Sequence, residues 1–280
     1  MLRQVRNMHV KAIKMRWLTG GDNYSYLLST QDKTKSWLID PAEVLEVLPN
    51  LDSSERKSIQ FIANTHHHYD HAGGNTGILA ALGKENIKPR VLAGSHVSPA
   101  TTDVPEHQQQ FTLGNLLVSC IRTPCHTQDS VCYHVKDPET SEQALFSGDT
   151  LFTAGCGRFF EGNAQEMDVA LNQRILQEVG EPNWSLTRVY PGHEYTKGNA
   201  KFVRKAIYVN PNENKHFDNL EKFALENDVT TGRFTLADET QFNPFMRLDD
   251  PIVRKAIGDA NGSWTRVQVM DKLRKLKNIM

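Results

Sequence analysis

The sequence has little of what marks membrane-spanning, disulfide-stabilised or nucleic-acid-binding proteins. No apolar run approaches the roughly 20 residues that a membrane-spanning helix needs, which excludes that class. The chain has only four cysteines and no Cys-x-x-Cys pair, so we expect no disulfide framework and infer an intracellular protein. Its 32 Lys and Arg are balanced by 33 Asp and Glu, so it lacks the positive charge that attracts nucleic acid. These absences favour a small molecule as the partner.

Acidic residues are also absent from the first 21 positions. The basic residues there are Arg3, Arg6, Lys11, Lys14 and Arg16. A basic segment without acid is typical of mitochondrial targeting. From His9 onward, however, the residues fit the first strand of the fold, which leaves only about eight residues for targeting. The sequence therefore indicates either the cytoplasm or the mitochondrial matrix, without deciding between them.

The pattern of apolar residues predicts a strand-rich part followed by a helical part. Short apolar or alternating runs bounded by turn residues predict strands at 10–15, 24–29, 36–39, 58–63, 90–93, 110–113, 116–121, 131–135, 144–146 and 187–190. Helical spacing predicts helices at 44–48, 78–82 and 164–179. Strand patterns then cease, and helical patterns broken by Asn-Pro pairs continue to the end. We therefore divide the chain into a catalytic domain at 1–195 and a helical domain at 196–280.

A cluster of potential metal ligands follows one predicted strand directly. The residues from Thr65 to His71 read Thr-His-His-His-Tyr-Asp-His. Side chains two apart in an extended chain point the same way, so His66 and His68 could bind one ion. Asp70 and His71, where the chain turns, could reach a second ion. We interpret this stretch as a metal motif rather than a solvated polar loop.

Three further ligand-type residues follow strand ends beside Gly or Pro. They are His126 in Thr-Pro-Cys-His-Thr, Asp149 in Ser-Gly-Asp-Thr and His193 in Pro-Gly-His-Glu-Tyr. Their shared position predicts that they meet at one edge of a layered sheet, where functional residues usually lie. Asp149 suits a bridge between two cations because a carboxylate has two oxygens. We expect no ligand role for the remaining histidines, which are His9, His67, His96, His107, His134 and His216.

These motifs resemble those of the metallo-β-lactamase superfamily, whose signature Thr-His-x-His-x-Asp-His is present at 65–71. Within it, the chain is similar to the hydroxyacylglutathione hydrolases, the glyoxalase II family. The similar segments are Thr-Pro-Cys-His-Thr, Gly-Asp-Thr-Leu-Phe, Ala-Gly-Cys-Gly-Arg-Phe, Pro-Gly-His-Glu-Tyr, Asn-Pro-Phe-Met-Arg and the C-terminal Leu-Arg-x-x-Lys. The resemblance implies an α+β fold, in which a four-layer αββα sandwich is followed by a C-terminal α-helical domain.

The resemblance also implies a ligand set for two divalent metal ions, of which zinc is favoured and iron or manganese are alternatives. One ion would be bound by His66, His68 and His126, the other by Asp70, His71 and His193, and both by Asp149. The ions would lower the pKa of a shared water, so that hydroxide is available at neutral pH. Asp149 as the bridge and Asp70 as the group that orients or accepts the proton would be the catalytic residues.

By the same resemblance, the substrate is a glutathione thioester. S-D-lactoylglutathione and related 2-hydroxyacyl thioesters would be hydrolysed to glutathione and D-lactate or another 2-hydroxy acid, the second step of methylglyoxal detoxification. The residues implied in substrate binding are Arg158, Phe160, Tyr195, Arg274 and Lys277. We expect the cationic ones to be exposed at the pocket mouth, where they would bind the carboxylates of glutathione. Many relatives carry Lys and Tyr in place of Arg158 and Phe160, so this chain would lack a phenolic hydrogen bond to the substrate.

Three alternatives share parts of this pattern. A mononuclear iron glutathione persulfide dioxygenase would have the same fold but use fewer of the ligands. A nuclease of the superfamily is disfavoured by the balanced charge. A non-catalytic binding module is disfavoured by the presence of the full ligand set. We expect a monomer that binds neither nucleic acid nor membranes.

Overall fold

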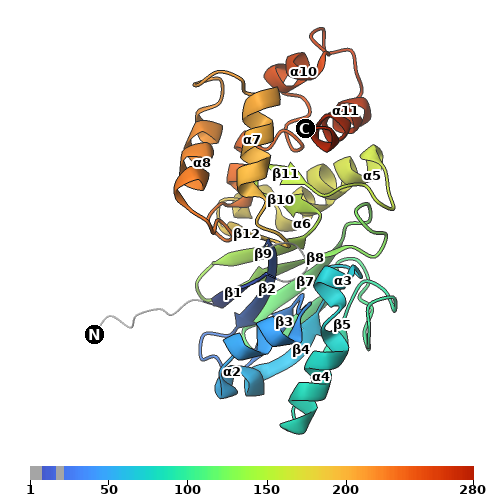
Figure 1. Cartoon of the computed structure of the whole chain (residues 1–280), viewed down its shortest axis with the longest axis vertical. Helices are drawn as coiled ribbons and strands as arrows, with labels where there is room; N and C mark the ends of the chain where they lie inside the picture. Colours follow the sequence, from blue (N-terminus) through green and yellow to red (C-terminus); the bar gives the residue numbers. More distant parts are fainter. Residues whose placement is uncertain (1–7, 17–21) are drawn as a thin grey trace, which may run out of the picture.

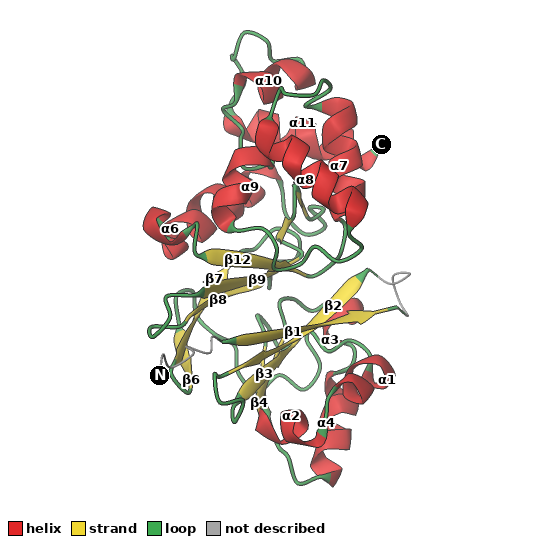
Figure 2. Ribbon diagram, turned by 90° about the vertical axis from the view of Figure 1, so that its left-hand side faces the viewer, coloured by secondary structure: helices red, strands yellow, loops and turns green. Residues whose placement is uncertain are grey.

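The structure is a computed structural model that describes residues 8–16 and 22–280. Two five-stranded sheets pack face to face, and helices cover the outer face of each, as Figures 1 and 2 show. This is the four-layer αββα arrangement that the resemblance implied. Arg3 and Arg6 of the basic N-terminal segment lie outside the described residues, as do Gly20 and Gly21 between the first two predicted strands.

The first sheet has the strand order β1-β2-β3-β4-β5. Its strands are β1 (His9–Met15), β2 (Asn23–Ser29), β3 (Ser36–Ile39), β4 (Ile59–Ala63) and β5 (Arg90–Leu92). The pairs β1-β2 and β2-β3 are antiparallel, whereas β3-β4 and β4-β5 are parallel. Helices cover the outer face of this sheet at the bottom of Figure 2. They include α1 (Val44–Val47), α2 (Ser53–Ser58) and α4 (Asn75–Lys84).

The second sheet has the order β12-β9-β8-β7-β6. Its strands are β6 (Gln110–Leu113), β7 (Leu116–Arg122), β8 (Val131–Lys136), β9 (Gln143–Gly148) and β12 (Thr187–Pro191). Aromatic side chains join the two sheets, with ring centroids 5.4 Å apart for Tyr26 and Phe146 and 6.0 Å apart for Trp37 and Tyr133. Because both sheets bury this shared face, the ends of β4, β7, β9 and β12 meet at one edge of the sandwich.

The connection from β9 to β12 holds a short hairpin and a helix. The hairpin pairs β10 (Leu151–Phe152) with β11 (Gly155–Cys156), and the sequence analysis missed it. The helix predicted at 164–179 is present as α5 (Ala164–Val169), a π-helical segment (Ala170–Ile175) and α6 (Leu176–Val179). It begins with a capping box formed by Asn163 and Glu166.

The chain described after β12 is helical, as the pattern predicted. Its helices are α7 (Thr196–Ala206), α8 (Lys215–Glu226), α9 (Leu236–Phe242), α10 (Pro251–Ile257) and α11 (Arg266–Asn278). Their apolar side chains, such as Phe202, Phe242 and Leu273, share one core with Leu145 and Val189 of the second sheet. The helices therefore pack on the sandwich rather than standing apart from it. None of the helices within the described residues is long and apolar enough to cross a membrane.

A buried carboxyl group, Glu239 of α9, joins this helical part to the β10-β11 hairpin. Its Oε2 atom accepts hydrogen bonds from the Ala154 backbone N–H at 3.0 Å and from Asn243 Nδ2 at 2.9 Å. Its Oε1 atom is buried and has no partner among the described residues. Burial disfavours the charged form and raises the pKa of Glu239 from 4.5 to about 8.

The raised pKa predicts how Glu239 changes stability with pH. Between 4.5 and about 8 the folded protein holds a proton that the unfolded chain releases, so the contribution to stability is lost as pH rises through this window. Glu239→Gln cannot ionise. As pH rises through this window, its free energy of unfolding should therefore fall less than that of the wild-type protein, and the difference should be up to about 1.4 kcal/mol per pH unit. Denaturant unfolding of both proteins from about pH 5 to about pH 9 measures the difference. Parallel curves would refute the prediction.

Candidate metal centre

The structure brings the seven predicted metal ligands together at the edge where β4, β7, β9 and β12 end. They form three overlapping groups whose ligand atoms lie within 4.8 Å of one another. The groups are His66 with His68 and His126, Asp70 with His71 and His193, and His66 with His71 and Asp149. The last ligands of the motif belong to α3 (Tyr69–Ala72), which turns the chain directly after β4. The remaining histidines in the described part of the chain lie outside these groups.

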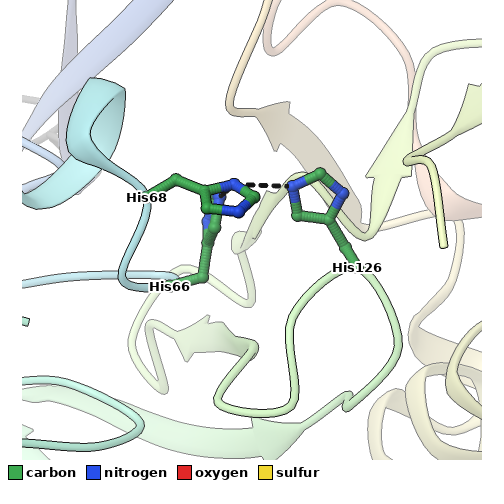
Figure 3. Close-up of side chains that lie close together, drawn as sticks. All are labelled: His66, His68 and His126. Atoms are coloured by element: carbon green, nitrogen blue, oxygen red, sulfur yellow. Dashed lines mark hydrogen bonds between the residues drawn. The ribbon is translucent and has the colours of Figure 1, made fainter. Parts of the chain in front are cut away.

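In the first group, ring nitrogens of three histidines converge (Figure 3). His68 Nδ1 lies 3.0 Å from His66 Nε2 and 3.1 Å from His126 Nε2. Burial is the largest cause that lowers the pKa of each of these rings, which favours their neutral form. The His66 Nδ1–H donates to Thr65 Oγ1 at 3.1 Å, which leaves a lone pair on Nε2. Neutral rings that aim nitrogens at one point are suited to a cation.

In the second group, His71 and His193 face each other beside the Asp70 carboxylate. The two Nε2 atoms are 3.2 Å apart, and His193 Nε2 lies 3.4 Å from Asp70 Oδ2. Asn23 Nδ2 donates to the Asp70 backbone oxygen at 2.8 Å and to its Oδ2 atom at 3.2 Å, which orients this carboxylate. The group therefore offers two rings and one carboxylate to a second cation.

Asp149 lies between the two groups. Its Oδ2 atom is 3.5 Å from His126 Nε2 and 3.3 Å from His193 Nε2, and its Oδ1 atom is 3.3 Å from His71 Nε2. Oδ1 is buried and accepts no hydrogen bond from the described residues. A buried carboxylate oxygen without a donor, placed among ring nitrogens, fits a site for cations. The residues present are thus suited to hold two ions with Asp149 facing both.

The electrostatics of the second group follow from its carboxylates. Burial alone would lower the pKa of His71, but the Asp149 and Asp40 carboxylates outweigh burial and raise the pKa well above its usual value. For His193, burial is likewise outweighed, chiefly by Asp149, which raises its pKa to about 9. Burial alone would raise the pKa of Asp149, but His193 and His71 hold it well below its usual range. The carboxylates of this group therefore concentrate negative charge, which positively charged partners stabilise.

The sequence analysis missed a buried carboxylate, Asp40, that supports the motif. It accepts hydrogen bonds from the Thr65 backbone N–H at 2.7 Å, from Thr65 Oγ1 at 2.6 Å and from His71 Nδ1 at 2.9 Å. Asp40 has a backbone φ of 48°, a conformation that Asp tolerates better than most residues. The Asp-Pro pair directly after β3 was the available signal in the sequence.

Asp129 has a similar supporting role for the other side of the motif. It binds His67 Nδ1 and Ser95 Oγ, each at 2.8 Å, and Thr127 Oγ1 at 2.7 Å. His67 thus points to Asp129 and takes no part in the three ligand groups. These bonds tie the motif to the loop that carries His126.

A groove of about 1500 Å³ opens beside the ligand groups. Every residue predicted to bind substrate lines it, namely Arg158, Phe160, Tyr195, Arg274 and Lys277. The Phe160 ring is 60% exposed, and its centroid lies 5.2 Å from that of His126. The Tyr195 ring stacks on His193 with centroids 4.6 Å apart. The groove therefore joins the ligand groups to aromatic and cationic side chains.

The expectation of exposed cations at the pocket mouth was wrong for Arg274, which is only 7% exposed. Because α11 packs against α5, this face of the helix turns inward. Arg274 Nη1 donates to the Cys156 carbonyl oxygen at 2.9 Å, and the guanidinium lies over the Phe245 ring. Lys277 donates to Asn199 Oδ1, and burial together with nearby Arg274 lowers its pKa to about 8.

Three of the cations that line the groove have no acidic partner. Neither Arg158, Arg274 nor Lys277 forms an ion pair within the described parts of the chain, although other arginines such as Arg254 and Arg266 do. Cations that lie together in a partly buried groove without ion-pair partners of their own favour an anionic ligand.

Comparisons with known proteins agree with this geometry. A family profile described as the metallo-beta-lactamase superfamily matches residues 18–193, and one described as the hydroxyacylglutathione hydrolase C-terminus matches residues 194–280. The chain is 60% identical over 282 residues to a mitochondrial hydroxyacylglutathione hydrolase of Saccharomyces cerevisiae, covering 100% of this chain and 99% of the relative.

A cytoplasmic isozyme of the same organism is 61% identical over 275 residues, which cover 98% of this chain and all of the relative. Among solved structures, ETHE1 from Myxococcus xanthus superimposes with a TM-score of 0.60 at 21% identity, covering 94% of this chain and 95% of the other. A likeness at that identity supports the fold alone.

Proposed function

Because this chain belongs to the hydroxyacylglutathione hydrolase family of the metallo-β-lactamase superfamily, we propose that it hydrolyses S-D-lactoylglutathione and related 2-hydroxyacyl glutathione thioesters. The products are glutathione and D-lactate or another 2-hydroxy acid. The observation that carries the proposal is the pair of ligand groups that flank Asp149 at the inner end of a cationic groove. Of the alternatives, a persulfide dioxygenase is not favoured, since the relatives are named hydrolases over their full length.

We propose that His66, His68 and His126 hold one divalent cation, that Asp70, His71 and His193 hold a second, and that Asp149 contacts both. Mixed His and Asp ligands suit zinc, with iron or manganese as alternatives. When bound, the cations would lower the pKa of water and polarise the thioester carbonyl.

The chain's own residues then have separate tasks in the reaction. Asp70, oriented by Asn23, would orient the attacking water or accept its proton. No dedicated general acid is needed for the leaving thiolate, because a thiol with a pKa of about 8.5 is already a good leaving group. The Phe160 ring beside His126 would cover one side of the reacting group.

Substrate binding would depend on the charged and aromatic side chains that line the groove. Arg158, Arg274 and Lys277 lie without acidic partners where a carboxylate of glutathione could accept their hydrogen bonds. Tyr195 offers a hydroxyl beside the ligand groups, whereas Phe160 offers only an apolar ring. We therefore propose that glutathione binds through a carboxylate rather than through a phenolic contact at position 160.

The test of this function is hydrolysis of S-D-lactoylglutathione by the purified protein, with metal analysis of the same sample. Thioester cleavage with two cations per chain is the expected result. Oxygen uptake with glutathione persulfide and one iron per chain would instead identify the dioxygenase. A folded protein that binds the thioester without cleaving it would identify a binding module.

Removing charge from the groove should weaken substrate binding more than catalysis. Arg158→Met and Lys277→Met each keep an aliphatic side chain and remove one positive charge. A charge-assisted hydrogen bond contributes about 1.5 to 3 kcal/mol, so each change should raise KM roughly tenfold or more while kcat changes little. Steady-state kinetics measure both constants. Lys222→Met on α8, an exposed lysine outside the groove, is the matched control. A fall in kcat at unchanged KM would show that these side chains do not bind the substrate.

We also propose a monomer located inside the cell, divided into a catalytic domain at 1–195 and a helical domain at 196–280. The location is supported by the free state of all four cysteines and by relatives named mitochondrial and cytoplasmic. Light scattering of the purified protein tests the monomer, and imaging of a C-terminally tagged full chain tests the compartment.

A further inference from the structure

The buried histidines of the metal centre are not all oriented in the same way. Metal-binding histidines usually donate a hydrogen bond from the nitrogen that does not face the metal, and this bond fixes the ring. Three of them follow this rule: His66 with Thr65 Oγ1, His71 with Asp40 Oδ2 and His126 with the Arg158 carbonyl oxygen. The exception is His193, whose Nδ1 atom is buried without a partner among the described residues. The orientation of the His193 ring must therefore be fixed by contacts other than a hydrogen bond to Nδ1.

The backbone around His193 is attached to the first sheet. His193 forms an isolated antiparallel bridge with Asn23, and the Glu194 N–H donates to the Asp22 carbonyl oxygen at 2.6 Å. The Tyr24 N–H donates to the Gly192 carbonyl oxygen at 2.9 Å. The segment that carries His193 is therefore placed by its neighbours in the chain and not by a bond to its own ring.

Glu194 is the side chain that secures this segment from the other side. Its Oε2 atom accepts hydrogen bonds from Tyr24 Oη at 2.7 Å and from the Thr230 N–H at 2.6 Å. Its Oε1 atom accepts from Thr230 Oγ1 at 2.7 Å. Tyr24 belongs to β2 of the first sheet, whereas Thr230 lies in the loop between α8 and α9. One carboxylate thus joins the sandwich to the helical part directly beside a metal ligand.

The residue on the other side of Glu194 adds a second restraint. The Tyr195 ring is nearly parallel to the His193 ring, with an interplanar angle of 6°. His193, Glu194 and Tyr195 all line the groove, and the Glu194 carboxylate is bound by Tyr24 and Thr230. Movement of the Glu194 backbone would therefore displace a cation ligand and its stacking partner together.

We propose that Glu194 is a positioning residue for His193, and that through Thr230 the helical part of the chain sets how tightly the cation at Asp70, His71 and His193 is held. This rests on the metal centre of the proposed function. It predicts that losing the carboxylate weakens one cation selectively, since the group of His66, His68 and His126 has hydrogen bonds that do not involve Glu194.

The test uses Co²⁺ binding to metal-depleted full-length protein, followed by its absorption spectrum and by stoichiometry. Wild type should bind two ions. Glu194→Ala should keep one and bind the other at least about tenfold more weakly, within the range that supporting residues of metal ligands show. In Glu194→Gln, the amide oxygen can still accept from Tyr24 and the Thr230 N–H, and the amide N–H₂ can donate to Thr230 Oγ1. This variant should therefore recover most of the binding of the second ion.

The matched control is Glu239→Ala, which also removes a buried carboxyl group that connects the helical part to the sandwich but touches no ligand segment. It should lower thermal stability and still bind two ions. If Glu194→Ala does not fold, Tyr24→Phe removes one donor to Glu194 and should weaken binding of the second ion but not of the first. The proposal is overturned if Glu194→Ala binds both ions as wild type does, or if Glu239→Ala loses the second ion equally. Fewer than two ions in wild type would refute the metal centre instead.

Discussion

Asp149→Asn should lose one of the two cations and reduce kcat/KM by roughly a thousandfold or more. The amide keeps one oxygen and replaces the other with an N–H₂ group, which cannot bind a cation. That N–H₂ group would face the ring nitrogen of His71 in one orientation of the amide and those of His126 and His193 in the other. A cation contributes several kcal/mol to stabilising charge in the transition state, and each 1.4 kcal/mol is tenfold in rate. Metal analysis and thioester kinetics of the same preparation measure both effects.

The control for this change is Asp259→Asn. Asp259 is equally buried and pairs with Arg254 at 2.7 Å, but it lies in the helical part away from the ligand groups. It should keep both cations even if it lowers stability. A variant of Asp149 with unchanged metal content and turnover would refute the two-cation site.

Asp40→Ala should be the most destabilising single change at the metal centre. Asp40 is 2% exposed and accepts three hydrogen bonds, so its loss leaves two donors of Thr65 and the Nδ1–H of His71 unpaired inside the sandwich. An unsatisfied buried donor costs about 1 to 3 kcal/mol, which gives a loss of roughly 3 kcal/mol or more. That is a large share of the 5 to 15 kcal/mol typical of a folded domain.

The same variant should also bind one cation more weakly, because His71 loses the partner that fixes its ring, an effect of about 10- to 100-fold in affinity. Denaturant unfolding and Co²⁺ titration measure the two effects separately. Asp32→Asn is the comparison, since Asp32 accepts hydrogen bonds from Thr30 and Thr34 but is exposed, and it should change neither quantity appreciably. Wild-type stability in Asp40→Ala would show that the site does not depend on this carboxylate.

The sequence was informative wherever the chemistry is local. The motif at 65–71 places four ligand-type residues on one strand end and the turn after it, so their spacing alone predicted a metal site. Alternating apolar residues predicted the strands of both sheets for the same reason, because each strand buries its face over a few consecutive residues. The switch to helical spacing after Tyr190 is likewise visible residue by residue.

Contacts between distant segments were not visible in the same way. Asp40 and His71 are separated by 31 positions, and Tyr24 and Glu194 by 170. No local period links such residues, so a single sequence shows Asp40 only as the end of a strand and Glu194 only as part of a turn. Arg274 was expected to be exposed at the pocket mouth. Packing of α11 against α5 instead turns its side chain toward the Cys156 carbonyl oxygen.

By itself, the sequence determined which side chains of metal-ligand type follow the strand ends, the α+β class of the fold and the order in which strands and helices follow. Ligand type and short spacing are sufficient for those conclusions. Only the tertiary structure decided that Asp149 lies between the two groups, that Asp40 binds His71, that Glu194 joins Tyr24 to Thr230, and that Arg274 is buried beside a groove. Each of these depends on segments far apart in the chain that meet only because two sheets bury a common face and the helices pack across their edge.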